Sequence, residues 1–349
     1  MNTPHSKDHR SALPGPENIT RTALPNGITI LVRSNFNSAT LSIKGYVKTG
    51  SILDPLEKLG LAYLTANGLM LGTAKHDTQA LYNEIESIGA RLGFSSGTLS
   101  TSFSAHCLSE DLDLILGLVA ESLQSPTFPE KECRRQKNQL LTALAIRAQD
   151  TSSMAALAFD QIIFKDHPYQ YAEEGYPETV AAISREDLVQ FYNSTYGPLG
   201  MVVVLVGAVE PDRAILAVEQ ALGDWNNPHQ AALPEIPPVK PPLDQEKKRV
   251  IIAGKSQADI VMGCLAPSRL SPDFHALRLG NNILGEFGMM GRVGQSVRED
   301  SGLAYYAYSS LNLGMGPGSW ELIAGVNPRN IDQAIQLMVK EARRFINEP

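Results

Sequence analysis

Cysteine is scarce in this chain of 349 residues, and the few cysteines are scattered. Cys107, Cys133 and Cys264 are odd in number and far apart in the sequence. This spacing excludes a disulfide framework and a zinc site made of clustered cysteines, and it is typical of reduced thiols in a cytoplasmic protein. We therefore expect a cytoplasmic location.

Runs of basic residues and long apolar runs are also missing. Lys and Arg total 30 against 37 Asp and Glu, and the net charge of −7 argues against a nucleic-acid partner. No stretch has the apolar length of a membrane span or of a signal-peptide core. Residues 1–19 are polar and contain His5 and His9, so we predict a flexible tail there and no membrane span.

The order of the predicted elements indicates an α+β fold rather than alternating strands and helices. Short apolar runs predict strands, whereas apolar residues at three- and four-residue spacing predict helices. Strands are expected at 28–32, 41–47 and 201–206, with one or two more within 90–106. Helices are expected at 61–71, 78–88, 112–123, 130–149, 154–164 and 185–193.

A proline-rich segment divides the chain into two parts. Residues 233–242 read Leu-Pro-Glu-Ile-Pro-Pro-Val-Lys-Pro-Pro, which cannot form a helix or a central strand. We therefore predict a tail at 1–19, a first half at 20–232, a linker at 233–246 and a second half at 247–349.

The second part repeats the pattern of the first. The strand beginning at Ala39 resembles the one at Ala258, and the helix at Ser109 resembles the one at Pro328 with the same separation, which indicates an internal duplication. Counterparts of the helices from residue 130 onward and of the strand 201–206 would fall after Pro349. We expect the second half to be incomplete, as in a truncated chain, and weak because a central strand is missing.

One helical segment has the frame of a metal site without its ligands. Residues 60–73 read Gly-Leu-Ala-Tyr-Leu-Thr-Ala-Asn-Gly-Leu-Met-Leu-Gly-Thr. This resembles the G-L-A-H-x-x-E-H-x-x-x-x-G-T helix of the inverted zincin peptidases, the pitrilysin, insulinase and mitochondrial processing peptidase family. Tyr63, Ala66 and Asn67 stand where the resemblance implies histidine, glutamate and histidine. The resemblance implies a glutamate as the third zinc ligand. Its position, judged from Asp150, is occupied here by Ala143.

Further segments resemble this family in order and spacing, over nearly everything after Thr20. The resemblance implies two duplicated α/β-roll halves with mostly antiparallel sheets. The matching segments are His167-Pro-Tyr169, Gly175, Ile183 to Leu188, Tyr196-Gly-Pro198 and Val206-Gly207.

Histidine is placed unfavourably for another metal site. The only histidines four residues apart are His5 and His9 in the tail, and a lone histidine such as His167 is expected to be structural. After loss of the ligands, the helix around Tyr63 is expected simply to pack. We predict no metal and no cofactor in this chain, with zinc in a partner.

A segment of the second half retains its chemistry. Residues 297–306 read Val-Arg-Glu-Asp-Ser-Gly-Leu-Ala-Tyr-Tyr and resemble the family signature R-E-x-x-G-L-x-Y. The resemblance implies that Arg298 and Tyr305 reach the zinc site of a partner, in trans. A guanidinium can hold a peptide carbonyl and a phenol can donate to an oxyanion. The alternative is ordinary packing near a helix end and a strand start.

Two further segments, one polar and one glycine-rich, are candidates for binding a ligand. The polar stretch from Gly93 to Thr98, with the candidate peptide-binding residues Ser95, Ser96, Gly97 and Thr98, is expected to start the strand that the resemblance implies for adding an extended peptide to a sheet edge. The alternative is a solvent-facing hairpin strand. The run from Gly285 to Gly294 lacks the ending of a phosphate loop and is interpreted as a flexible loop.

These observations predict a zinc-less subunit of a heteromeric peptidase, inactive alone. Its partners would be a catalytic H-x-x-E-H paralogue, or else further copies of itself, and its ligand an unfolded peptide. The alternative is a scaffold resembling the core proteins of the respiratory cytochrome bc complex. An independent enzyme using Asn67 or Tyr63 is disfavoured, because neither has a base or metal nearby in the sequence.

Overall fold

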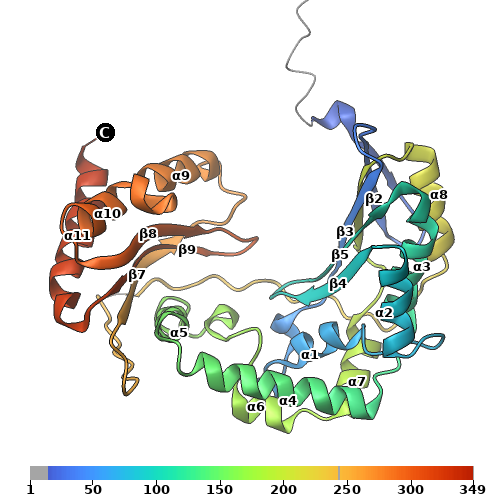
Figure 1. Cartoon of the computed structure of the whole chain (residues 1–349), viewed down its shortest axis with the longest axis horizontal. Helices are drawn as coiled ribbons and strands as arrows, with labels where there is room; N and C mark the ends of the chain where they lie inside the picture. Colours follow the sequence, from blue (N-terminus) through green and yellow to red (C-terminus); the bar gives the residue numbers. More distant parts are fainter. Residues whose placement is uncertain (1–14, 243, 349) are drawn as a thin grey trace, which may run out of the picture. The chain divides into compact units, whose positions relative to one another are not determined.

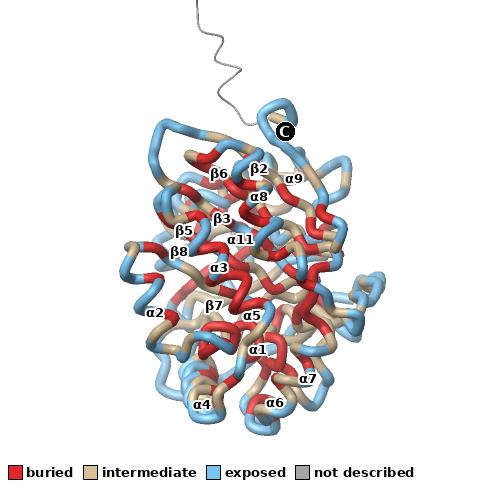
Figure 2. Tube along the Cα trace, turned by 90° about the vertical axis from the view of Figure 1, so that its right-hand side faces the viewer, coloured by how far each residue is buried: buried red, intermediate tan, exposed pale blue. Residues whose placement is uncertain are grey.

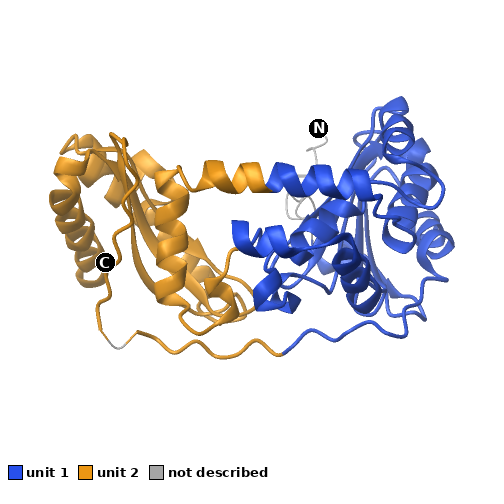
Figure 3. Ribbon diagram, turned by 90° about the horizontal axis from the view of Figure 1, so that it is seen from below, with its two compact units in different colours: residues 1–140, 173–234 blue, residues 141–172, 235–349 orange. Residues whose placement is uncertain are grey.

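The computed structural model describes residues 15–242 and 244–348, so His5 and His9 lie outside the described part. The chain forms two compact units (Figure 3). Unit 1 comprises residues 1–140 and 173–234, and unit 2 comprises residues 141–172 and 235–349. Residues 141–172, which the sequence pattern groups with the first half, therefore cluster with unit 2.

Unit 1 is built on a six-stranded sheet with the order β1-β2-β6-β3-β5-β4. Figure 1 labels β2, β3, β5 and β4 of this sheet. Only the β2–β6 pair is parallel, and the other neighbours are antiparallel. The expected mixed fold with mainly antiparallel pairing is confirmed. The strands are β1 (Thr20–Ala23), β2 (Thr29–Ser34), β3 (Thr40–Val47), β4 (Arg91–Ser96), β5 (Thr101–Leu108) and β6 (Val202–Gly207).

The helices of unit 1 pack beside this sheet, with α3 against α8 and α1 against α7. Their starts have local causes: the Ser184 hydroxyl accepts from the Asp187 N–H at the start of α7, and Pro211 begins α8. The helices are α1 (Leu61–Gly68), α2 (Thr78–Ser87), α3 (Leu112–Gln124), α4 (Glu130–Arg147), α6 (Pro177–Ala182), α7 (Arg185–Thr195) and α8 (Pro211–Leu222), with α4 continuing into unit 2.

Alternating side chains form the core of unit 1. Successive residues of a strand point to opposite faces, so buried residues alternate with less buried ones along β3, β6 and the first part of β2. Buried stretches lie along these strands in Figure 2. Fully buried members of these strands and of α3 include Ile30, Leu41, Ile43, Val47, Val203, Leu205, Ile115, Leu116, Val119 and Leu123.

Unit 2 contains a three-stranded antiparallel sheet with the order β7-β9-β8. The strongly amphipathic helix α11 (Ile331–Asn347) buries Ala334 and Met338 against it, in a cluster with Val297, Ala324 and Val326. The remaining elements are α5 (Thr151–Ile163), η6 (Pro168–Gln170), β7 (Ala258–Ala266), α9 (Phe274–Asn281), η7 (Asn282–Glu286), η8 (Gly288–Met290), α10 (Arg292–Gly294), η9 (Gln295–Glu299), β8 (Ala304–Asn312), β9 (Gly318–Val326) and η10 (Pro328–Asn330).

Helix α5 belongs to unit 2 because it packs on β7. The Thr151 hydroxyl donates to Asp259 on that strand, and Lys248 Nζ reaches Gln161 Oε1 at 2.5 Å. No local sequence pattern predicts these contacts, because the contacting residues are far apart in the sequence.

The glycine-rich run at 285–294 is not an open loop, so the interpretation as a flexible loop is wrong. It forms η7, η8 and α10, which pack closely on one another. A Cβ atom on Gly291 would lie 2.2 Å from the Cα of Gly285, and one on Gly294 would lie 2.0 Å from the carbonyl oxygen of Gly288. These glycines therefore permit close backbone approach.

His167 is a structural residue, as expected. Its ring is buried, its Nδ1 accepts from the Tyr169 N–H at 3.1 Å, and its Nε2 lies 3.0 Å from the Pro237 carbonyl oxygen. Both contacts are satisfied by a neutral ring protonated on Nε2. Burial lowers the pKa of His167, which favours this neutral form.

Candidate functional site

Helix α1 carries the residues that replace the zinc ligands. It begins at Gly60, whose φ of 99° lies in the left-handed region that glycine tolerates. The carboxylate of Asp54 accepts from the N–H groups of Gly60 at 2.9 Å and Ala62 at 2.8 Å, which satisfies donors at the helix start. The local frame of the motif is thus intact and well capped.

The side chains on this frame do not suit zinc. Ala66 is fully buried and has no donor atom, while Asn67 Nδ2 donates to the carbonyl oxygen of Tyr63 at 2.8 Å. Burial, with the nearby charge of Glu174, raises the pKa of Tyr63, so this residue stays a neutral phenol. Zinc in proteins binds thiolates, imidazoles and carboxylates, and none is offered at these positions.

Ala143 also provides no ligand. It lies on α4, is exposed, and presents only a methyl group. Throughout residues 15–242 and 244–348, no group of three or more His, Cys, Asp and Glu side chains is arranged to hold a metal ion.

Arg298 lies at the end of the helical turn η9. Its guanidinium is half exposed and its Nε lies 3.6 Å from Glu299 Oε1, a loose contact. The backbone around it is firmly held: the Arg298 carbonyl accepts from the Gly302 N–H at 2.9 Å, and the buried Val297 accepts from the Leu303 N–H at 3.1 Å. A fixed backbone thus carries a side chain with little to restrain it.

Tyr305 lies on β8, seven residues after Arg298, and is 62% exposed. The pairing with β9 shifts at this point: Ala304 faces Val326, whereas Tyr306 faces Gly325. Tyr305 is therefore the extra residue of a β-bulge. The bulge explains how a tyrosine at this place in the strand can point into solvent.

Ser95 and Ser96 lie on β4, an edge strand whose only described neighbour is β5. The Gly97 N–H donates to the Ser100 carbonyl at 2.9 Å, and hydrogen-bonded pairs alternate along an antiparallel ladder. Leu92, Phe94 and Ser96 therefore direct their backbone N–H and C=O groups away from β5. This edge can accept another strand.

Gly97 and Thr98 lie after β4, in the turn to β5. Their carbonyl oxygens accept from the N–H groups of Ser51 at 3.1 Å and Ile52 at 3.0 Å, and the Thr98 hydroxyl donates to Glu173 at 2.6 Å. These groups hold the turn in unit 1, so the open edge consists of Ser95, Ser96 and the residues before them.

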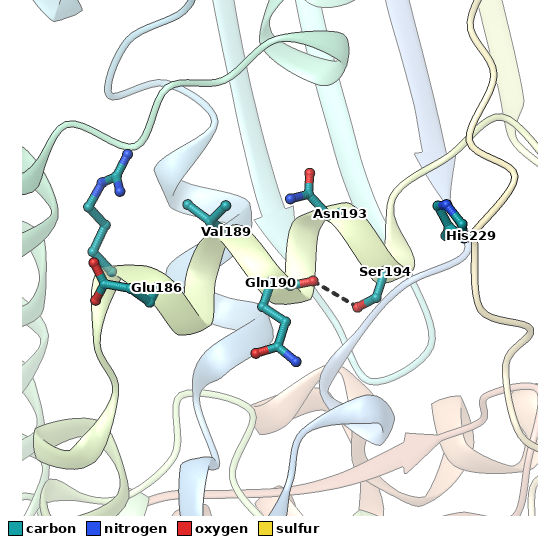
Figure 4. Close-up of a pocket in the computed structure, with 7 residues that line it drawn as sticks. Glu186, Val189, Gln190, Asn193, Ser194 and His229 are labelled. Carbon is teal, nitrogen blue, oxygen red and sulfur yellow. Dashed lines mark hydrogen bonds between the residues drawn. The ribbon is translucent and has the colours of Figure 1, made fainter.

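An open groove of about 450 Å³ lies beside α7, and no motif in the sequence predicts it. The Ser194 hydroxyl donates to the Gln190 carbonyl at 2.9 Å (Figure 4). Arg185 donates to the carbonyls of Phe128 and Thr127. None of the predicted site residues lines it. The lining residues are Arg185, Glu186, Val189, Gln190, Asn193, Ser194 and His229.

The fold, the capped motif helix and the Arg298 segment together define an inverted zincin architecture. Two family profiles match the chain: one described as insulinase (peptidase family M16) over residues 29–171, and one described as peptidase M16 inactive domain over residues 182–349. The chain belongs to peptidase family M16.

Individual relatives agree with this assignment. The chain is 26% identical over 324 residues to an uncharacterized zinc protease of Mycobacterium leprae, covering 92% of this chain and 72% of that protein. It is 24% identical over 268 residues to cytochrome b-c1 complex subunit 1 of Mus musculus, covering 76% and 55%. The crystal structure of a peptidase M16 inactive domain from Pseudomonas fluorescens superposes with a TM-score of 0.87 at 25% identity, covering 95% and 80%.

The chain lacks the zinc-binding residues of the H-x-x-E-H motif. Tyr63, Ala66 and Asn67 occupy the ligand and base positions on α1. It is therefore a member of the family without the zinc-binding motif. No helix within the described ranges is both long and apolar enough to cross a membrane.

Proposed function

We propose that this chain is the non-catalytic subunit of a two-chain M16 peptidase. In this role it supplies Arg298 and Tyr305 to the zinc site of a partner that carries an intact H-x-x-E-H motif. It also helps to bind unfolded peptide, and it works in the cytoplasm. The chain alone has no peptidase activity.

The contrast between the two segments carries this proposal. Helix α1 has lost every zinc ligand, whereas the segment 297–306 keeps a half-exposed arginine and an exposed tyrosine. A guanidinium offers fixed donors to a peptide carbonyl, and a phenol can donate to an oxyanion that develops beside a metal. Side chains with such chemistry are suited to act on another subunit when, like Arg298 with its loose contact to Glu299, they are weakly held in their own fold.

The open edge of β4 supports peptide binding. An extended substrate can add to this edge through the outward backbone groups of Leu92, Phe94 and Ser96. Backbone pairing is indifferent to side-chain identity, so it suits unfolded chains of varied sequence. Ser95 and Ser96 leave this edge small and polar.

Reconstitution tests the proposal directly. The chain would be expressed alone, together with the H-x-x-E-H paralogue encoded in the same genome, and with that paralogue after its motif glutamate is changed to glutamine. We expect cleavage of an unfolded reporter peptide only by the intact pair. Equal activity of the paralogue with and without this chain would overturn the proposal.

A scaffold role is the second candidate, supported by the similarity to the mouse cytochrome b-c1 subunit. In that case the chain would isolate with a stable complex that lacks peptidase activity. Substitution of Arg298 or Tyr305 would then leave the assembly and its function unchanged, which separates this candidate from the first.

A further inference from the structure

Tyr305 is exposed only because the strand is out of register at that point. Beyond the bulge, Ala307 and Ser309 alternate toward the buried side of β8, and regular alternation would place Tyr305 on that side as well. The bulge cancels this alternation and leaves the ring 62% exposed. Whatever stabilises the bulge therefore sets the direction of the Tyr305 phenol.

The next residue, Tyr306, is held by a carboxylate on β7. Its hydroxyl donates to Asp259 Oδ1, and the same carboxylate accepts from the Thr151 hydroxyl of α5 and from Gln257 Nε2 at 3.1 Å. Three donors from separate segments thus converge on Asp259, which fixes the carboxylate. Burial, together with the hydrogen bond and charge of Asp259, raises the pKa of Tyr306 to about 12, so the phenol keeps the proton that it donates.

The backbone opposite Tyr306 is shaped to receive its ring. Tyr306 pairs with Gly325 on β9, and a Cβ atom there would lie 2.6 Å from Tyr306 Cε1 and 2.9 Å from Gln257 Nε2. Only a residue without a side chain leaves room for both groups. Gly325 therefore allows the ring to lie flat across β9 and to reach Asp259 on β7.

We propose that Asp259, Tyr306 and Gly325 are positioning residues for Tyr305, and that the Tyr306–Asp259 hydrogen bond holds the β8 bulge in the form that turns the Tyr305 phenol outward. This inference rests on the proposed function, because it assigns a purpose to Tyr305. The role is indirect, since Tyr306 acts through its neighbour rather than on the substrate. Because Thr151 starts α5, the same carboxylate also ties the bulge to that helix.

The test uses the reconstituted pair and single-atom changes. Tyr306→Phe removes the donor, Asp259→Asn weakens the acceptor, and Gly325→Ala displaces the ring without touching a hydroxyl. We expect each to lower kcat about tenfold with KM within about twofold, as for a displaced oxyanion donor. The matched controls are Tyr308→Phe, on the same strand, and Gly314→Ala, where an added Cβ meets nothing within 4 Å; both should keep full turnover.

A double substitution separates positioning from general destabilisation. If Tyr306 acts through Tyr305, then Tyr306→Phe added to Tyr305→Phe should lower kcat by less than twofold further. Losses that multiply in the double variant, or full turnover of Tyr306→Phe, would overturn the inference. Normal turnover of Tyr305→Phe alone would also overturn the inference, whereas normal turnover of both Tyr305→Phe and Arg298→Ala would overturn the proposed function.

Hydrogen exchange on the chain alone gives a readout that needs no partner. Tyr306→Phe and Gly325→Ala should speed amide exchange at residues 303–307 about tenfold, while α11 and the controls stay unchanged. Unchanged exchange at the bulge in both variants would show that the hydrogen bond does not hold it.

Discussion

At the scale of single residues, three small substitutions remove the metal chemistry of α1 while leaving its fold. Ala66 fills a fully buried position, and Asn67 closes a hydrogen bond to its own helix at Tyr63. The Asn67 amide thus has its hydrogen-bond partner within the helix. This outcome was predictable from the sequence, because a phenol, a methyl group and a carboxamide cannot replace two imidazoles and a carboxylate.

We expect the purified chain to carry no stoichiometric zinc, although its relatives include proteins named zinc proteases. Elemental analysis after dialysis measures this, with a variant lacking residues 1–19 to remove His5 and His9. Zinc held one per chain in that variant would contradict the prediction. Restoring Tyr63→His, Ala66→Glu, Asn67→His and Ala143→Glu together provides the matched comparison for metal uptake.

Phe128 is expected to contribute strongly to the stability of unit 1. Its side chain is 1% exposed, it packs edge-on against Tyr192 with ring centroids 5.7 Å apart, and it covers Gly68 at the end of α1. Phe128→Ala should lower the free energy of unfolding by about 3 to 5 kcal/mol. Chemical denaturation measures the loss, and Phe36→Ala, at a 60% exposed site, should cost little.

At the scale of elements, the periodic segments were predictable and the irregular ones were not. Helix α3 has a sustained apolar pattern, and it lies where the sequence predicts it. The bulge in β8 was not predictable from the sequence, because it depends on Asp259 and Gly325, which lie on other strands. The close approach of Gly285 and Gly291 was not predictable either, because it depends on how separate helical turns pack.

The edge of β4 yields a prediction about peptide binding. Ser96→Pro removes an outward N–H and spares the ladder to β5, so it should weaken binding of an unfolded peptide by the reconstituted pair about tenfold. Arg21→Pro, on the opposite edge strand β1, is the matched control. Fluorescence titration with a labelled peptide measures both, and equal affinity in the two variants would argue against binding at β4.

Asp160 on α5 gives unit 2 a stability that depends on pH. Burial first, and then the charge of Glu321, raises its pKa from 3.8 to about 7. Its contribution to the free energy of folding is therefore fully present below pH 3.8 and is lost as pH rises through about 7.

Asp160→Asn should remove that dependence. The gain in Tm over the unsubstituted chain should grow from pH 4.5 to pH 7 and level off above it. Thermal unfolding followed at pH 4.5, 6, 7 and 8 measures this difference, in which the titration of other groups cancels. Glu235→Gln, an equal loss of charge at an exposed site, should show no such trend.

At the scale of the whole molecule, the two units differ in the candidate functional features that they carry. Unit 1 keeps an open sheet edge and a motif helix without ligands, whereas unit 2 keeps an arginine and a bulged tyrosine. The sequence predicts this contrast, because the motif letters are local. It does not predict that α5 packs in unit 2, since that depends on contacts between distant segments.

Arg298 and Tyr305 should determine turnover by the assembled pair. If the Arg298 guanidinium and the Tyr305 phenol stabilise charge that develops only in the transition state, then Arg298→Ala and Tyr305→Phe should lower kcat by roughly 10² to 10³-fold. Assembly, followed by size-exclusion chromatography, and the Tm of the chain alone should be unchanged, because Tyr305 is exposed and Arg298 is half exposed with only a loose ion pair. Tyr82→Phe, at another exposed tyrosine, serves as the control. Full turnover in both assembled variants would leave these residues no part in catalysis and would favour the scaffold role.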